Sequence, residues 1–74
     1  MHKIRNEQII QIVGKNLRKI RTEKGFTQEQ LAEESSVSQV QIARIESGKL
    51  NTSISTIAAL GSALNVDIGM FFVS

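Results

Sequence analysis

The sequence predicts an all-α domain on three observations. Apolar residues recur at helical spacing near the N-terminus. Two helix starts of the same design then stand eleven residues apart, which leaves room for two short helices joined by a tight turn. After a loop, a mostly apolar stretch has the spacing of another helix. With 74 residues and no cysteine, the chain is expected to form one domain, 1–74, without disulfides or thiolate metal sites.

The first helix is expected between Asn6, a candidate N-cap, and Gly25, a candidate stop. Its apolar stripe, with lysines and arginines between, is Ile10, Val13, Leu17 and Ile20. Gly14 inside the helix costs roughly 1 kcal/mol against alanine, so its first turns are expected to fray. Residues 1–8 are expected to be flexible, and His2 in this tail is expected to be neither a ligand nor a base.

The next two helices are indicated by their N-terminal residues. Thr27 can cap the amide of Gln30, and the Gln30 side chain can return the bond, while Phe26 and Leu31 stand at the positions of a hydrophobic staple. The same arrangement recurs with Ser38 and Gln41 as the box and Val37 and Ile42 as the staple. One helix is therefore expected over Thr27–Ser35 and the next over Ser38–Ser47, with Gly48 as the residue that stops it.

The last third of the chain is apolar. Ser53 is a further candidate cap, and the helix after it is expected to use Ile54, Ile57, Ala58, Leu60 and Leu64. The tail from Val66 to Ser74 has two interpretations. Asp67 can cap a last helical turn, yet residues 68–73 are also rich in strand formers.

Gln28 to Ser47 has the length and spacing of a helix-turn-helix. Ala32 is small where two helices must cross closely, and Val37, Ile42 and Ile45 are expected to point inward. The opposite face of the second helix then carries Ser38, Gln39, Val40 and Arg44. Glutamine can pair bidentately with adenine and arginine with guanine, and valine can touch a thymine methyl. These four residues are the candidate base contacts on double-stranded DNA.

The distribution of charge agrees with such a partner, although an ordinary solvated helix explains it as well. Seven of the nine basic residues lie in the first 24 positions, and four of the seven acidic residues lie between Glu29 and Glu46. The seven basic residues are Lys3, Arg5, Lys15, Arg18, Lys19, Arg21 and Lys24. Beyond Lys49 the only charge is Asp67. One end thus suits a polyanion and the other a protein contact.

The segments Thr27-Gln28-Glu29-Gln30-Leu31-Ala32 and Ile42-Ala43-Arg44-Ile45-Glu46-Ser47-Gly48-Lys49 resemble the Xre family of the lambdoid phage repressors and Cro. The similarity runs from about Val13 to Val66. It implies a compact bundle of four or five helices, lambda-repressor-like, and a dimer on a two-fold symmetric operator. Controller proteins of restriction–modification systems are similar in size and plan.

The resemblance also implies roles for single residues. Gln28, with Thr27 at the same helix start, is expected to contact phosphate, as are Lys49 and Asn51 in the loop. Arg21 and Glu46 match a pair that joins the first helix to the third. The family usually has glycine where this chain has Ser36, at a turn position that tends to be left-handed. Many relatives place arginine and proline where Leu50 and Thr52 stand here.

A homodimer is expected to form through the C-terminal third. From Leu50 to Val73 the sequence has fourteen apolar residues and one charge, more than one small core absorbs. Residues 66–74 are the expected dimerisation tail, with an interface formed by Ile68, Met70, Phe71 and Phe72.

The expected function is that of a transcriptional regulator, a repressor or an autoregulator. An antitoxin that binds its own operator and a toxin protein is the alternative. No catalytic constellation is present, so an enzyme is not expected, nor is a cofactor, a metal site or a small-molecule ligand. RNA binding is disfavoured because the chain has no tyrosine or tryptophan on which bases stack. Without a signal peptide or an unbroken apolar span, a cytoplasmic protein that does not enter a membrane is expected.

Overall fold

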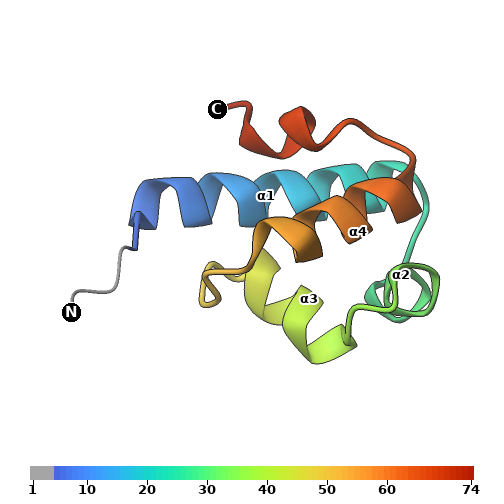
Figure 1. Ribbon diagram of the computed structural model, residues 1–74. Coiled ribbons are helices and arrows are strands. Elements are labelled where there is room, and N and C mark those ends of the chain that lie inside the picture. Colours follow the sequence, from blue (N-terminus) through green and yellow to red (C-terminus); the bar gives the residue numbers. More distant parts are fainter. Residues whose placement is uncertain (1–4) are drawn as a thin grey trace.

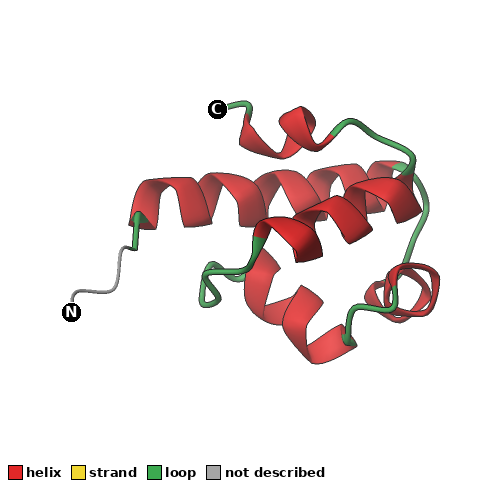
Figure 2. Cartoon of the chain, in the orientation of Figure 1, coloured by secondary structure: helices red, strands yellow, loops and turns green. Residues whose placement is uncertain are grey.

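The computed structural model describes residues 5–74 and contains four α-helices and one 3₁₀ helix in that range, with no strand (Figure 2). The elements are α1 (Glu7–Glu23), α2 (Gln28–Ser35), α3 (Gln39–Glu46), α4 (Ile54–Leu64) and η1 (Ile68–Phe72). The all-α prediction is confirmed. Of the segment 1–8 expected to be flexible, residues 1–4 lie outside the described residues, and residues 7 and 8 belong to the first turn of α1.

Each α-helix begins directly after the cap residue that the sequence predicts. Asn6, Thr27, Ser38 and Ser53 all have extended backbones, and their side-chain oxygens accept from the amide three residues on, which satisfies an amide that the helix itself leaves unpaired. The full capping box at Thr27 is present. The second box is wrong in one half, because within residues 5–74 the exposed side chain of Gln41 does not return the bond to Ser38. An exposed side chain such as that of Gln41 can hydrogen-bond to water instead, so little is gained by returning the bond.

The helices pack around one core (Figure 1). α1 is the long central helix and contacts α3 on one side and η1 on the other, while α2 packs against α3 and α4. The core cluster draws side chains from all five elements and from the turn between α2 and α3: Val13, Leu17, Ile20, Leu31, Val37, Ile42, Ile45, Ile57, Leu60, Leu64 and Phe71. Since every helix contributes apolar side chains to one core, α3 is held rigidly by its neighbours.

The two open interpretations of the tail resolve to a helical one. Residues 68–72 form a 3₁₀ helix, and the Asp67 carboxylate accepts from the amide of Gly69 at 3.4 Å. η1 lies along α1, as the red ribbon in Figure 1 shows.

Candidate nucleic-acid interface

The turn between α2 and α3 fixes the angle between the two helices. Ser36 has φ 62° and ψ 16°, so the left-handed position flagged in the sequence is present with a serine in it. The Ser35 hydroxyl oxygen accepts from the Val37 amide at 3.1 Å, and Val37 is buried. Ser38 then caps α3. The turn is thus held by local hydrogen bonds and one anchored side chain, despite the steric cost at Ser36.

The outer face of α3 brings together the four candidate base contacts. Ser38, Gln39, Val40 and Arg44 are all exposed, whereas Ile42 and Ile45 on the inner face are fully buried. Val40 is 67% exposed and is the apolar member of this face. The face therefore offers an amide, a guanidinium, a hydroxyl and an apolar group together at a convex surface.

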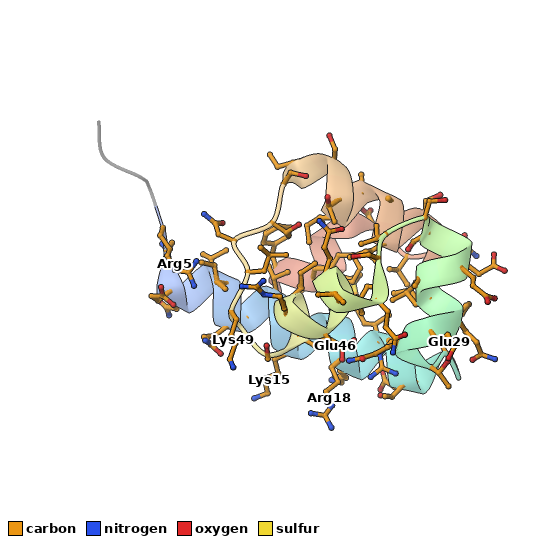
Figure 3. The ribbon with its side chains drawn as sticks, turned by 90° about the horizontal axis from the view of Figure 1, so that it is seen from below. Arg5, Lys15, Arg18, Glu29, Glu46 and Lys49 are labelled. Atoms are coloured by element: carbon orange, nitrogen blue, oxygen red, sulfur yellow. The ribbon has the colours of Figure 1, made fainter. Side chains whose placement is uncertain are left out.

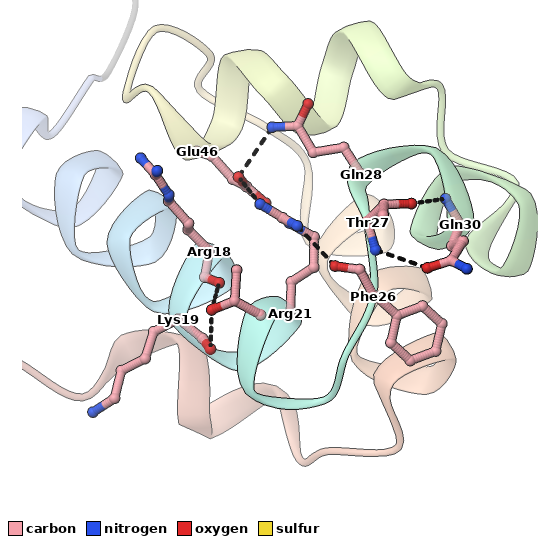
Figure 4. A network of polar contacts seen from close by, with 9 residues as sticks. Arg18, Lys19, Arg21, Phe26, Thr27, Gln28, Gln30 and Glu46 are labelled. Carbon is pink, nitrogen blue, oxygen red and sulfur yellow. Dashed lines mark hydrogen bonds and ion pairs between the residues drawn. The ribbon is translucent and has the colours of Figure 1, made fainter.

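A buried ion pair holds the end of α3 against α1 (Figure 4). The Arg21 guanidinium donates to both oxygens of the Glu46 carboxylate, at 2.6 and 3.0 Å, and the two side chains are only 11% and 5% exposed. Arg21 also donates to the carbonyl of Phe26 at 2.8 Å. The planar, two-point contact sets the orientation as well as the distance of the two helices.

Gln28 joins the same network from the start of α2. Its side-chain amide donates to the Glu46 carboxylate at 3.1 Å, so the residue is half-buried and already oriented. Thr27 beside it accepts from the Gln30 amide through Oγ1, which leaves its hydroxyl proton available to an outside acceptor. Lys49 and Asn51 are exposed in the loop between α3 and α4. Contact of these four residues with phosphate stays a prediction.

Gly14 is a functional position that the sequence analysis did not identify as such. A Cβ placed on Gly14 would lie 2.2 Å from the carbonyl oxygen of Ile45 and 3.2 Å from that of Glu46. The backbones of α1 and α3 therefore touch at the last turn of α3, and only a glycine permits that approach. The sequence shows only the helix cost of Gly14, because its partners, Ile45 and Glu46, lie far along the chain.

Asn16 is a second residue that the sequence analysis missed. Its side-chain amide donates to the carbonyl oxygens of Phe71 and Val73, at 2.9 and 2.7 Å. These are carbonyls at the end of η1, where helical partners run out. Asn16 thus fastens the tail to α1, and its sequence separation of more than 50 residues gave no local signal.

The proposed interface in the tail needs one correction. Phe71 is fully buried in the chain's own core, so the prediction that it contacts a second copy is wrong. Met70 and Phe72 are exposed on the other two faces of η1, whereas Ile68, three residues before Phe71 and on the same face, is 38% exposed. A 3₁₀ helix has three residues per turn and buries only one of its three faces, which explains why neighbouring phenylalanines have opposite surroundings.

Other kinds of site find no support in the described part of the chain. No group of three histidine, cysteine, aspartate or glutamate side chains in residues 5–74 is arranged to hold a metal ion. Over the same residues, no helix combines the length and the apolar character that crossing a bilayer requires.

Comparison with known proteins identifies the family. The helix-turn-helix family model matches residues 17–71. The chain is 39% identical over 56 residues to the immunity repressor protein of Bacillus phage phi105, a match that covers 76% of this chain but only 39% of that repressor. It is 38% identical over 55 residues to the HTH-type transcriptional regulator y4dJ of Sinorhizobium fredii, with 74% and 71% of the two chains covered.

The fold agrees with a solved structure. The restriction–modification controller protein C.AhdI from Aeromonas hydrophila superposes with a TM-score of 0.82 at 33% identity, over 85% of this chain and 96% of the other. These relatives are regulators, and the prediction that the chain is not an enzyme is confirmed by them. The chain belongs to the Xre-like helix-turn-helix family of DNA-binding transcriptional regulators.

Proposed function

We propose that the protein is a sequence-specific repressor or autoregulator that binds a palindromic operator as a homodimer. The observation that carries this proposal is the outer face of α3. It exposes Ser38, Gln39, Val40 and Arg44 together on a helix whose inner face is locked into the core. A rigid, convex helix with groups suited to base edges fits the major groove, which admits one α-helix. A cytoplasmic location, where operator DNA is accessible, is part of this proposal.

Base and phosphate contacts are assigned to different residues. Gln39 pairs with adenine, Arg44 with guanine and Val40 with a thymine methyl, while Ser38 contacts a base edge at the helix start. Thr27, Gln28, Lys49 and Asn51 contact phosphates. The start of α2 favours an anion because its first amides have no helical partner and the helix dipole is positive there. The geometry of Gln28 supports its role, since the Glu46 carboxylate already orients its amide.

The test begins with selection of bound duplexes from a random DNA pool. With the selected operator, Gln39→Ala and Arg44→Ala are expected to relax preference at particular positions by about 1–3 kcal/mol each. Lys49→Ala is expected to weaken binding to all DNA sequences alike. Gln8→Ala is the matched control, because Gln8 is an exposed glutamine on α1 rather than on α3. Equal weakening of every sequence by all of the α3 variants would contradict base recognition by this face.

Dimerisation is assigned to the exposed apolar residues of the C-terminal third. Ile68, Met70 and Phe72 are exposed on η1, and Ile54 at the start of α4 is 79% exposed. Phe72 and Ile54 line the same apolar depression, together with Ile9. A two-fold partner covers such a patch with one surface used twice. It also sets two recognition helices about 34–36 Å apart, one turn of DNA.

Light scattering tests the dimer. Phe72→Glu and Met70→Glu are expected to give a monomer that stays folded, because both side chains lie outside the core. A wild-type monomer at micromolar concentration would contradict the proposed interface. The same exposed surface then favours the second candidate, an antitoxin, whose toxin would cover these residues. That candidate requires a stable complex with a toxin encoded beside the gene.

A further inference from the structure

Three basic side chains form what we term the basic edge: Lys15 and Arg18 on α1, and Lys49 after α3. Figure 3 views the molecule from the side of α2 and α3, and all three lie along one border of that view. Lys15 and Arg18 share a surface hollow with Glu46, the last residue of α3. The basic edge therefore flanks the C-terminal end of the recognition helix, at the opposite end from its cap, Ser38.

The fold gives no reason for this concentration of charge. All three side chains are exposed. Within residues 5–74 the ion pairs are Arg5 with Glu7 and Arg21 with Glu46, and neither includes a residue of the basic edge. The carboxylate that shares the hollow, Glu46, already accepts two hydrogen bonds from Arg21 and one from Gln28. Like charges gathered without a counter-charge favour an outside polyanion.

We propose that the basic edge binds backbone phosphates of the operator, so that Lys15 and Arg18 extend the interface from α3 onto α1. This proposal depends on the proposed function, and it adds two residues that the assigned phosphate contacts do not include. Lys15 precedes the segment matched by the family model, 17–71, and Arg18 lies inside it.

The dimensions of the helix and the groove support the proposal. α3 has eight residues, which makes it about 12 Å long. The major groove of B-DNA is about 12 Å wide. When the N-terminal half of α3 meets the bases, its C-terminal end therefore lies near the wall of the groove, where the phosphates are. Gly14 brings α1 into backbone contact with that same end of α3. Lys15 and Arg18, one and four residues after Gly14 on α1, are then within reach of the DNA phosphates.

The experiment compares two double variants that each remove two positive charges. Lys15→Gln with Arg18→Gln removes the α1 part of the basic edge. Lys19→Gln with Lys24→Gln is the matched control. Lys19 points away from Arg18 and borders Val73 and Ser74 of the tail, in a hollow that Lys15 lines from its other side. Lys24 lies beside Glu33 and Glu34 of α2. Binding to the selected operator and to a scrambled duplex of equal length is measured across a salt series, and ethylation interference maps the phosphates that matter.

Each phosphate contact contributes about 0.9 to the slope of log K against log salt. The Lys15→Gln, Arg18→Gln double variant is therefore expected to make the negative slope less steep by about 1.8 for each bound subunit, equally on both duplexes. It should also lose ethylation interference at two phosphates per half-site, while the control keeps the wild-type pattern. Lys15→Arg with Arg18→Lys, which keeps both charges, is expected to keep the slope. Melting curves without DNA are expected to be unchanged for all variants, because exposed charges contribute little to stability.

Two results would overturn the inference, and they are distinguishable. If the edge and control variants shift the slope equally, only net charge acts and the basic edge makes no contact. If the wild-type protein itself shows no salt-dependent binding to duplex DNA, the proposed function fails and the inference fails with it.

Discussion

Replacing Gly14 with alanine tests how closely α1 and α3 must approach. On the present backbone the new Cβ would lie 2.2 Å from the Ile45 carbonyl oxygen. An unstrained contact needs roughly 3.5 Å, so the helices must separate by about 1 Å. Overpacking costs about 1–3 kcal/mol, and the upper end applies because the obstructing atoms belong to the backbone. Alanine recovers about 1 kcal/mol of helix propensity. The net loss is about 2 kcal/mol.

A loss of that size lowers the Tm by about 8–16 °C in a domain this small. Circular dichroism melts of the wild type and the variant measure it directly. Gly69→Ala is the matched control, because a Cβ there meets only the Asp67 carboxylate, at 4.0 Å. If Gly14→Ala instead raised the Tm, as helix propensity alone requires, the close approach of the two backbones would be disproved.

Three further changes probe the turn, the tail and the buried pair. Ser36→Gly is expected to raise the Tm, since glycine avoids the cost of about 1 kcal/mol for a left-handed residue with a Cβ; a lower Tm would mean that the serine side chain is needed. Phe71→Ala is expected to cost about 3–5 kcal/mol in a urea titration. Phe72→Ala in dilute monomer should cost far less, and equal losses would contradict the buried position of Phe71. Arg21→Met is expected to cost about 3–5 kcal/mol, because it leaves the buried Glu46 carboxylate unpaired. Adding Glu46→Leu should restore most of that stability. If the double variant were as unstable as Arg21→Met alone, an unpaired charge would not be the cause.

Local signals predicted the helices well. Caps and staples act over three to five residues, so Asn6, Thr27, Ser38 and Ser53 could be identified from the sequence as helix starts. The exposed face of α3 followed from the helical period of its two buried isoleucines. These features need no knowledge of where the other helices lie.

Contacts between distant segments could not be predicted in the same way. Asn16 reads as an ordinary polar residue on α1 until η1 is placed beside it, 55 residues away along the chain. Phe71 and Phe72 are adjacent and chemically identical, so composition assigned both to an interface. Phe71 is buried and Phe72 is exposed because η1 has three residues per turn and docks on α1 through one face.

The three contacts that α1 makes with the end of α3 show how the recognition helix is positioned. Gly14 sets the distance, the pair of Arg21 and Glu46 sets the orientation, and the Gln11 amide reaches the Gly48 carbonyl at 3.5 Å just beyond the helix. The same helix holds the tail through Asn16. Since α1 is a single rigid element, the surface proposed to contact DNA and the surface proposed to contact a second copy share one support. A fixed spacing between two recognition helices requires such a support, because flexibility between the two surfaces would blur the half-site distance.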